Sequence, residues 1–210
     1  MTVVRADQPL PGWCALRAFE IVTLSRDAPV ERTPQAPRER LIGTSGTTQF
    51  RQAGRSLLLK EFQFIDIDPT LGPWTMLGTT DTAGFVRLCG VWGDDLGGCG
   101  IFRVRPVDQP ETKGDPVTYR KNTAVDRHYH DCDEYWIMLE GNGQVAVDDR
   151  HATVTTGDCL CIGMGHPHDF AFTETEVRAV FFETTLEGRM RTGHLWNHTH
   201  GPAEPVAGRV

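Results

Sequence analysis

The amino-acid sequence predicts an all-β protein made of about ten short strands. From residue 56 onward, apolar or alternating runs of strand length follow one another along the chain. Such runs are typical of strands that have one or both faces buried. Clusters of glycine, proline and aspartate separate the runs, and the 22 glycines of the chain suit many tight reversals. Together these observations favour a β-sandwich or a small closed barrel.

The first 55 residues predict an N-terminal extension ahead of the barrel. Residues 13–24 form its most apolar stretch and fit either a short amphipathic helix or an edge strand, because their periodicity does not decide. Residues 27–40 contain three prolines and six charged residues, which predicts an exposed linker.

The barrel itself is expected to span residues 56–190. Its candidate strands are residues 56–67, 74–77, 84–91, 100–105, 117–123, 134–140, 143–148, 151–155, 159–162, 168–172 and 177–184. Residues 191–210 contain three histidines and Trp196, and they are expected to form an irregular C-terminal tail.

Composition excludes several classes of function. The formal net charge is -7 and there is no basic run, which argues against a nucleic-acid or anionic-membrane partner. No stretch approaches the roughly 20 apolar residues of a membrane span, and the N-terminus lacks the features of a signal peptide. The six cysteines are therefore expected to be reduced thiols in a cytoplasmic protein.

The most informative segment lies in the second half of the chain, where all eight histidines are found. His128 and His130 are two residues apart, and Glu134 follows four residues later. Residues two apart in a strand face the same side, so both imidazoles can project into the barrel. Residues 131–133 predict a turn, after which Glu134 opens the next strand beside the two histidines. This is ligand spacing for a divalent transition metal.

Strand alternation also predicts the residues around this site. Trp136 and Met138 share the parity of Glu134 and are expected to line the substrate cavity. Tyr135, Ile137 and Leu139 are expected to face the other way.

A fourth ligand is available downstream. Residues 157–168 predict a turn, a buried strand, a glycine turn and then His168. Pro167 biases His166 toward extended geometry, which helps to hold His168 in place.

Both segments resemble the two sequence motifs of the cupin superfamily. The first motif covers residues 122–141 and the second covers residues 157–172, within a resemblance that extends over roughly residues 100–185. The positions that match are His128, His130, Glu134, Gly141, Gly157, Gly165 and His168. Three positions depart: Asn122 replaces the first glycine, Gly163 replaces a proline and Phe172 replaces an asparagine. Asparagine tolerates positive φ, so the first departure is mild.

The resemblance implies a jelly-roll barrel in which His128, His130, Glu134 and His168 bind one divalent metal. Fe(II) is the first expectation, and Mn, Ni, Zn and Cu stay open because the ligand types suit all of them. The resemblance also implies a homodimer and a small-molecule substrate. A degenerate second cupin unit in the N-terminal half is a further alternative.

For function, the resemblance implies first an Fe(II)-dependent oxygenase acting on a small organic molecule. Two alternatives stay open. One is a redox-neutral isomerase, epimerase or lyase, and the other is a non-catalytic small-molecule binder. Glu134 and His166 are the candidate catalytic residues, although a histidine at such a turn is more often a rim residue. Tyr135 has the wrong parity for a catalytic base.

Other groups of side chains are weaker candidates for a functional site. A structural zinc site at Cys132, Cys159 and Cys161 is disfavoured, because closed sites usually carry Cys-x-x-Cys pairs on loops. Arg103 and Arg105 alternate along a candidate strand and fit either an anion site or, more often, a solvated outer face. The histidines at 194, 198 and 200 lie in the tail, which lacks the preorganisation of a metal site.

Overall fold

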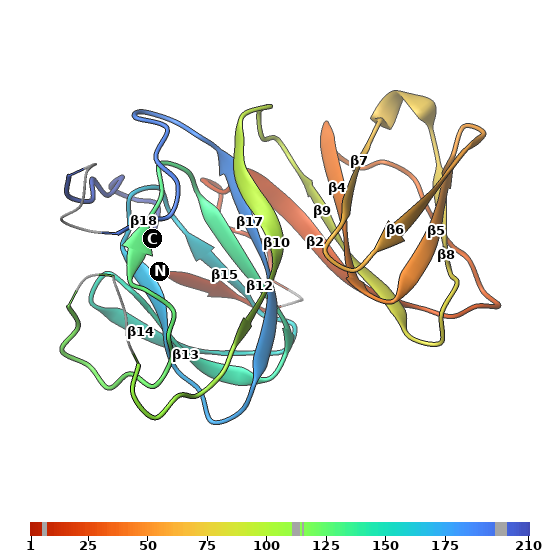
Figure 1. Cartoon of the computed structure of the whole chain (residues 1–210). Helices are drawn as coiled ribbons and strands as arrows, with labels where there is room; N and C mark the ends of the chain where they lie inside the picture. The colour runs from red at the N-terminus through yellow and green to blue at the C-terminus, as the bar shows by residue number, and fades with distance from the viewer. Residues whose placement is uncertain (6–7, 111–113, 115, 196–200) are drawn as a thin grey trace. The chain divides into compact units, whose positions relative to one another are not determined.

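The computed structural model describes residues 1–5, 8–110, 114, 116–195 and 201–210, and these are almost entirely β. Their one helical element is a short 3-10 turn, η1 (Pro69–Leu71). None of the described residues belongs to a helix with the length and hydropathy to cross a membrane. The all-β prediction is confirmed, and the chain divides into two compact units (Figure 1).

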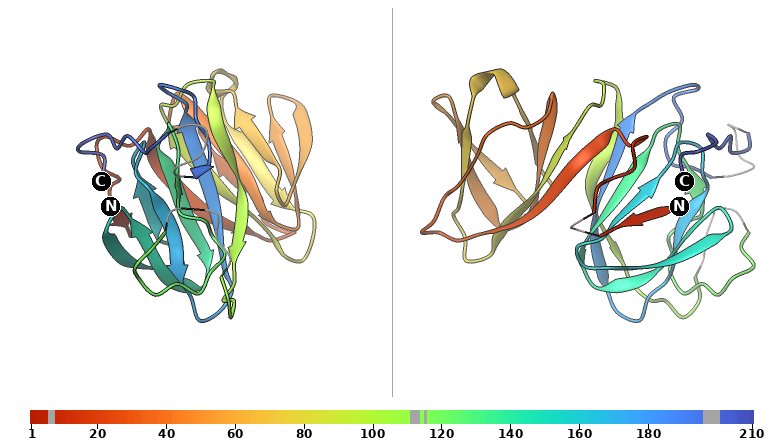
Figure 2. Two further views of the ribbon diagram at one scale, coloured as in Figure 1. Left: turned by 60° about the vertical axis from the view of Figure 1, so that its left-hand side comes forward. Right: turned by 180° about the vertical axis from the view of Figure 1, so that it is seen from behind.

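The larger unit comprises Met1–Cys14 and Gly93–Val210. It contains two five-stranded antiparallel sheets. The first sheet has the order β1 (Thr2–Val4), β15 (Cys159–Ile162), β12 (Glu134–Glu140), β17 (Val177–Thr185), β10 (Leu96–Val104). The second has the order β14 (Arg150–Thr155), β13 (Asn142–Val147), β16 (His168–Phe172), β11 (His128–Tyr129), β18 (His194–Leu195). The N- and C-terminal marks lie close together in every view of this unit (Figure 2).

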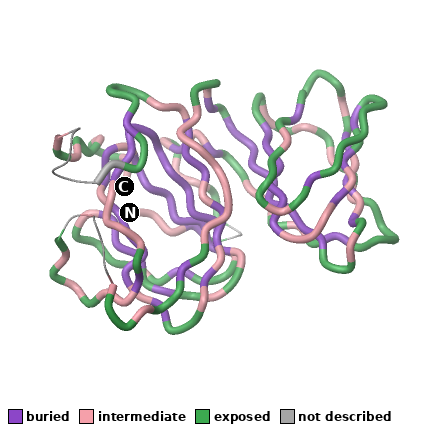
Figure 3. The backbone as a smooth tube through the Cα atoms, viewed as in Figure 1, coloured by how far each residue is buried: buried purple, intermediate pink, exposed green. Residues whose placement is uncertain are grey.

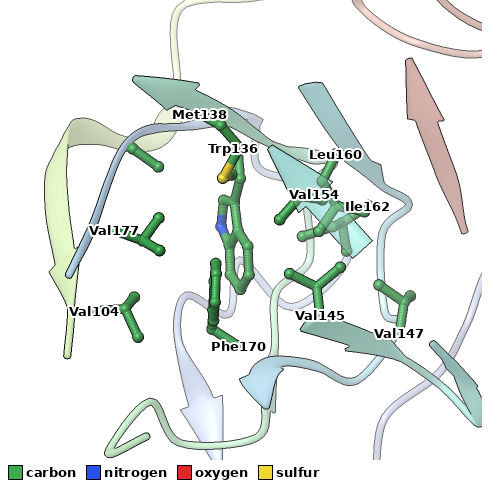
Figure 4. Packing of buried hydrophobic residues seen from close by; sticks show 11 residues of the cluster. Val104, Trp136, Met138, Val145, Val147, Val154, Leu160, Ile162, Phe170 and Val177 are labelled. Carbon is green, nitrogen blue, oxygen red and sulfur yellow. The ribbon is translucent and has the colours of Figure 1, made fainter. Parts of the chain in front are cut away.

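One apolar core joins the two sheets of the larger unit. The first sheet contributes Trp136, Met138 and Leu160, and the second contributes Val145 and Phe170, all at most 2% exposed. The Trp136 and Phe170 rings stack with centroids 6.2 Å apart, as seen in Figure 4. β12 and β15 are buried along most of their length, which explains why their sequences are continuous apolar runs (Figure 3).

The smaller unit, Ala15–Trp92, has two four-stranded antiparallel sheets of its own. One has the order β2 (Leu16–Leu24), β9 (Ala83–Gly90), β4 (Arg38–Ser45), β7 (Phe64–Ile67). The other has the order β3 (Val30–Arg32), β8 (Trp74–Gly78), β5 (Thr47–Gln52), β6 (Arg55–Lys60). A separate apolar core around Trp74 and Phe85 holds these sheets together.

The structure places the domain boundary elsewhere than the sequence predicts. The expected start of the barrel at residue 56 falls inside β6, and residues 56–92 belong to the smaller unit. The expected linker, residues 27–40, instead contains β3 and the start of β4. Part of its charge is buried: Glu39 is 2% exposed and forms an ion pair of 2.8 Å with Arg87, whereas Asp27, Glu31 and Arg38 are exposed. Composition does not show which charged residues form a buried ion pair in the fold. For this reason the linker prediction is wrong.

The strand predictions have mixed outcomes. The bounds of β12, β15 and β16 agree with the prediction, and residues 13–24 contain an edge strand, β2, rather than a helix. Residues 117–123 form no strand. Residues 56–67 split into β6 and β7 around a turn in which Phe62 has a φ of 67°.

Candidate metal centre

The four candidate ligands come from both sheets of the larger unit. His128 and His168 are direct cross-strand neighbours in β11 and β16. His130 follows β11, and Glu134 is the first residue of β12 in the other sheet. The expectation that Glu134 lies on the strand hydrogen-bonded to the histidines is therefore wrong. It reaches them across the interior, because residues 131–133 carry the chain from one sheet to the other.

The structure brings these four side chains to one point. One ligand atom from each of them lies within 4.8 Å of those of the others. Glu134 Oε2 lies 2.8 Å from His168 Nε2 and 3.1 Å from His130 Nε2. These three atoms are buried and have no hydrogen-bond partner. A buried carboxylate oxygen that faces two imidazole nitrogens in this way is costly, and a bound cation would stabilise the cluster.

The spacing suits a divalent transition ion. Two ligand atoms about 2.1 Å from one ion and at right angles to it are about 3.0 Å apart. The two Glu134–histidine separations, 2.8 and 3.1 Å, bracket this value. Three imidazoles and a carboxylate also match the ligand preferences of Fe, Mn, Ni, Cu and Zn. The residues present therefore fit a single bound metal.

Hydrogen bonds behind the ligands fix their orientation. Nδ1 of His128 donates to the carbonyl oxygen of Asp126 at 2.7 Å, and Nδ1 of His168 donates to that of His166 at 2.8 Å. Both contacts leave Nε2 as the donor atom available to a metal. On the carboxylate, the indole N–H of Trp136 donates to Oε1 of Glu134 at 2.6 Å and leaves Oε2 free.

His130 has a different environment. The backbone N–H of Gly193 donates to its Nδ1 at 2.6 Å, so Nδ1 carries no proton in this state. Coordination of a metal through Nε2 would require the proton to move to Nδ1. Oε1 of Glu183 lies 3.8 Å from this nitrogen.

Burial and mutual contact shift the pKa values of the ligands. Burial, with the neighbouring imidazoles, lowers the pKa of His128 to about 3, so this ring is neutral at physiological pH. Burial raises the pKa of Glu134, but the His130 and His168 rings outweigh it and hold that pKa well below its usual value. The Glu134 carboxylate in turn raises the pKa of His130 against the effect of burial. Glu134 is thus anionic and ready to bind a cation.

A cavity of about 290 Å³ opens beside the candidate ligands. Its lining consists of Phe102, Arg103, Val125, His128, Glu134, Trp136, Phe181 and Glu183. This volume is at the lower end of the range for small-molecule sites. The cavity can therefore hold a small organic molecule in contact with the metal ligands.

Glu183 is a site residue that the sequence analysis missed. It is the direct cross-strand neighbour of Glu134, in β17, and burial raises the pKa of its carboxyl group. Strand alternation from Phe181 would have placed it on the inner face. Its position beside Glu134 depends on strand register, which sequence does not give.

The other predicted pocket residues have different positions. Trp136 lines the cavity, whereas Met138 is fully buried in the apolar core and is not part of the lining. His166 does not enter the cavity. Its ring nitrogens contact Asp148 Oδ2 at 2.8 Å and the Val206 carbonyl oxygen at 3.1 Å, so its contribution is the backbone carbonyl that orients His168.

The structure also describes several of the weaker candidate residues. Tyr135 is fully buried outside the cavity, with its ring stacked near Phe182 at 6.4 Å. Arg105 forms an ion pair with Glu176 at the surface. The side chain of the histidine at 194, and the histidines at 198 and 200, lie outside the described residues.

The cysteines do not assemble as a thiol site. Cys159 and Cys161 are buried in β15. Cys132 instead belongs to a second group with metal-ligating atoms, formed with His130 and Glu183. Among the described residues, no group of metal-ligating side chains contains the three thiols together.

Comparisons with known proteins agree with this architecture. Residues 117–185 match the family model described as a cupin domain. The whole chain is 47% identical to the uncharacterized protein y4oW of Sinorhizobium fredii and covers 97% of it. At 10% identity, the chain is similar to the oxalate decarboxylase of Bacillus subtilis, with a TM-score of 0.59 over 89% of this chain and 73% of that one. An IolB-like protein of Salmonella typhimurium, 11% identical, gives a TM-score of 0.57 over 94% of this chain and 97% of that one. At these low sequence identities, the comparison shows that the two solved structures have the same fold as this chain.

Proposed function

We propose that this chain, which contains a cupin domain over residues 117–185, is a metal-dependent enzyme acting on a small organic molecule. One observation carries this proposal. Three buried ligand atoms without hydrogen-bond partners meet at the Glu134 carboxylate, and Glu134 and His128 line a cavity of about 290 Å³. A purely structural metal site would be closed by protein ligands rather than open to a cavity. The arrangement supports a metal placed to meet a substrate.

His128, His130, Glu134 and His168 would hold the ion. A divalent transition metal there would supply Lewis acidity or, as Fe(II), electrons for reduction of dioxygen. Four protein ligands leave two positions of an octahedral ion without a protein ligand. The B. subtilis oxalate decarboxylase, a fold relative, has Mn(II) centres. Fe(II) is our first proposal, with Mn(II) next.

The remaining side chains would seat the substrate and keep water away. Phe102, Trp136 and Phe181 form an aromatic wall of the cavity, with the Phe102 and Trp136 rings 5.1 Å apart. Aromatic walls bury the apolar part of a small molecule and exclude water from the reacting groups. Trp136 also holds Glu134 through its indole N–H.

We propose an Fe(II)-dependent oxygenase as the reaction type. The two positions without protein ligands and the aromatic wall support this choice. A specific observation favours a second candidate, a redox-neutral isomerase or lyase. Glu183 is a second carboxyl group in the same cavity, where it can take or return a proton of the substrate.

Oxygen dependence separates the two candidates. The protein would be loaded with Fe(II) or Mn(II) and incubated with a panel of small phenols, sugars and acids, with and without oxygen. Substrate-dependent oxygen uptake by the Fe(II) form supports the oxygenase. Equal turnover under strict anaerobiosis supports the isomerase or lyase, and ligand returned unchanged under both conditions contradicts an enzyme.

Replacement of His130 with alanine tests the centre itself. We expect metal content to fall by at least about tenfold, since each removed ligand or supporting contact costs on that order. The β-rich fold should persist. Inductively coupled plasma mass spectrometry measures the metal, and circular dichroism measures the fold. His151→Ala, on the exposed strand β14, is the matched control, and Cys161→Ser should also retain its metal. Normal metal content in His130→Ala would contradict the assignment.

A further inference from the structure

Among the described residues, no donor forms a hydrogen bond with the Glu183 carboxylate. Glu183 is 9% exposed, and Nδ1 of His130 lies 3.8 Å from its Oε1. That distance is too long for a hydrogen bond. Buried carboxylates are normally hydrogen-bonded. A carboxylate that lines a cavity without a donor is therefore positioned to accept a hydrogen bond from a ligand.

Strand β10 is shaped to leave room for this carboxylate. It carries Gly97 and Gly98 opposite Glu183 in β17. A Cβ atom at Gly97 would lie 2.6 Å from Oε2 of Glu183, and one at Gly98 would lie 3.3 Å from it. Any larger residue at Gly97 would displace the carboxylate. The glycines thus let the carboxylate lie against bare backbone, with the Cys132 thiol and the His130 ring as neighbours.

The lining of the cavity also includes aromatic rings, next to the polar side chains of Arg103, His128 and Glu134. The rings of Phe102, Trp136 and Phe181 line it, with centroids 5.1 Å apart for Phe102 and Trp136 and 6.4 Å for Phe102 and Phe181. Aromatic faces bind planar apolar groups by stacked or edge contacts. These walls fit the body of a small ring.

Among the described residues, the lining contains one arginine, Arg103, and it forms an ion pair with Glu176. Arg103 borders the cavity, but on β10 it alternates with the inward-facing Phe102, and its guanidinium lies 3.8 Å from Glu176. Its side chain is 44% exposed. The inner face instead carries two neighbouring carboxylates, Glu134 and Glu183. Beyond the metal, this environment repels carboxylate groups and favours hydrogen-bond donors.

We propose that Glu183 accepts a hydrogen bond from a hydroxyl group of the substrate, so that the site selects small, neutral, hydroxylated rings of the phenol class. The inference rests on the proposed function for the location of the site. It adds the substrate class and a specificity-determining residue. The flat walls hold the ring, and Glu183 recognises its hydroxyl group.

A pair of probes isolates this hydrogen bond. Phenol and its methyl ether, anisole, have the same ring, but only phenol can donate. Their affinities for the Mn(II)-loaded protein would be measured by calorimetry or by Trp136 fluorescence. Wild-type protein is expected to prefer phenol by about tenfold or more, as for a hydrogen bond to a charged acceptor.

Variants at position 183 assign the preference to this carboxylate. In Glu183→Leu the phenol preference should fall to about twofold or less, because the acceptor is gone. Glu183→Gln keeps the shape and a neutral acceptor, and it should lose at least about threefold of the preference. The Glu183→Gln variant also tests the proposal by itself if Glu183→Leu does not fold. Glu140→Gln, on the exposed end of β12, is the matched control and should keep the wild-type preference.

The results distinguish two kinds of failure. A phenol preference that persists in both variants overturns the proposal and assigns recognition to the metal. Loss of metal from Glu183→Gln also overturns it, since Glu183 would then be a ligand in the group with His130 and Cys132. If wild-type protein binds no metal, the proposed function fails. The phenol–anisole comparison on metal-free protein then still tests Glu183: a preference that Glu183→Leu abolishes supports the contact, and equal binding overturns it.

Discussion

The indole of Trp136 connects the apolar core to the candidate metal centre. Its ring stacks on Phe170 inside the core, and its N–H reaches Oε1 of Glu134 at 2.6 Å. One side chain thereby fixes which carboxylate oxygen faces the histidines. Contacts of this type behind a ligand commonly affect metal affinity by 10–100-fold.

Replacement of Trp136 with phenylalanine tests this connection. Phenylalanine keeps an aromatic ring but has no donor for Glu134, so metal affinity is expected to fall by about tenfold. Chelator competition measures the affinity, and thermal unfolding of the metal-free variant checks that the fold is kept. An unchanged affinity in a folded variant would show that Glu134 is oriented without the indole.

At this scale the sequence predicted which four side chains come together, but only part of their surroundings. His128, His130, Glu134 and His168 were identified because motif spacing is local, and the structure brings them together. Glu183 was missed because its place beside Glu134 comes from strand pairing between distant segments.

Two departures from the family motifs have structural reasons that no motif contains. Asn122 does not have positive φ. Its side chain donates to the Thr173 carbonyl oxygen at 2.7 Å and accepts from the Thr173 N–H at 3.0 Å. Gly163 has the C-terminal segment against it, because a Cβ atom there would lie 2.0 Å from the Arg209 carbonyl oxygen. Both contacts are made by residues far away in sequence.

At the scale of elements, the segment before β18 is held against the β11–β12 connection by a buried ion pair. Oδ1 of Asp131 lies 2.9 Å from the Arg191 guanidinium, and Asp131 also accepts the backbone N–H groups of Arg189 and Arg191. Both side chains of the pair are at most 6% exposed. This contact closes the chain over the edge of the metal centre.

Replacement of Asp131 with asparagine should destabilise the protein by about 3 kcal/mol at neutral pH, because it leaves a buried guanidinium unpaired. Burial raises the pKa of Asp131, but hydrogen bonds from Arg191 outweigh it and hold that pKa below its usual 3.8. The stabilisation is therefore present above pH 3.8 and is lost as the pH falls through the folded-state pKa. Urea unfolding of both proteins would show a constant difference from about pH 8 to 5 that narrows below about pH 4. If the difference in unfolding free energy narrows well above pH 4, the titrating group is not Asp131.

The contact between Gly193 and His130 leads to a prediction about metal loading. Nδ1 of His130 accepts the Gly193 N–H at 2.6 Å, but metal bound at Nε2 would place a proton on Nδ1. The two donors cannot face each other, so the Gly193 amide is expected to lose this hydrogen bond on loading with Zn(II). Amide exchange by NMR should then become faster at Gly193. A slower or unchanged rate would mean that His130 does not bind through Nε2.

The strand bounds were predicted best where strands are apolar, and two polar strands of the smaller unit were missed. β12, β15 and β16 are short buried runs between turn residues, and their bounds were correct. β4 and β5 were missed because they carry charged and amide side chains. In β4, Arg40 pairs with Asp66 of β7 at 2.7 Å, a contact that only the folded sheet reveals.

At the scale of the whole molecule, each of the two units has its own core. All four candidate ligands belong to the unit formed by Met1–Cys14 and Gly93–Val210. Residues 15–92 repeat the antiparallel two-sheet arrangement without a group of metal-ligating side chains among the described residues. The sequence suggested a second unit in the N-terminal half only as an alternative. Its bounds were not predicted, because the chain leaves the larger unit after residue 14 and returns at residue 93. The expected homodimer stays a prediction.

The division predicts where metal binding stabilises the chain. An ion at 100 times its dissociation constant suppresses openings that break its site by about 100-fold. Amides of β11, β12 and β16 should therefore exchange about 100-fold more slowly in the Mn(II) form than with chelator, if they exchange only through such openings. Amides of residues 15–92 are not expected to change, since no ligand lies there. Hydrogen-exchange mass spectrometry with peptides from both units measures this directly. Equal slowing of exchange in residues 15–92 would show that both units open together. If exchange is not slowed in β11, β12 and β16, the metal does not bind to these four side chains.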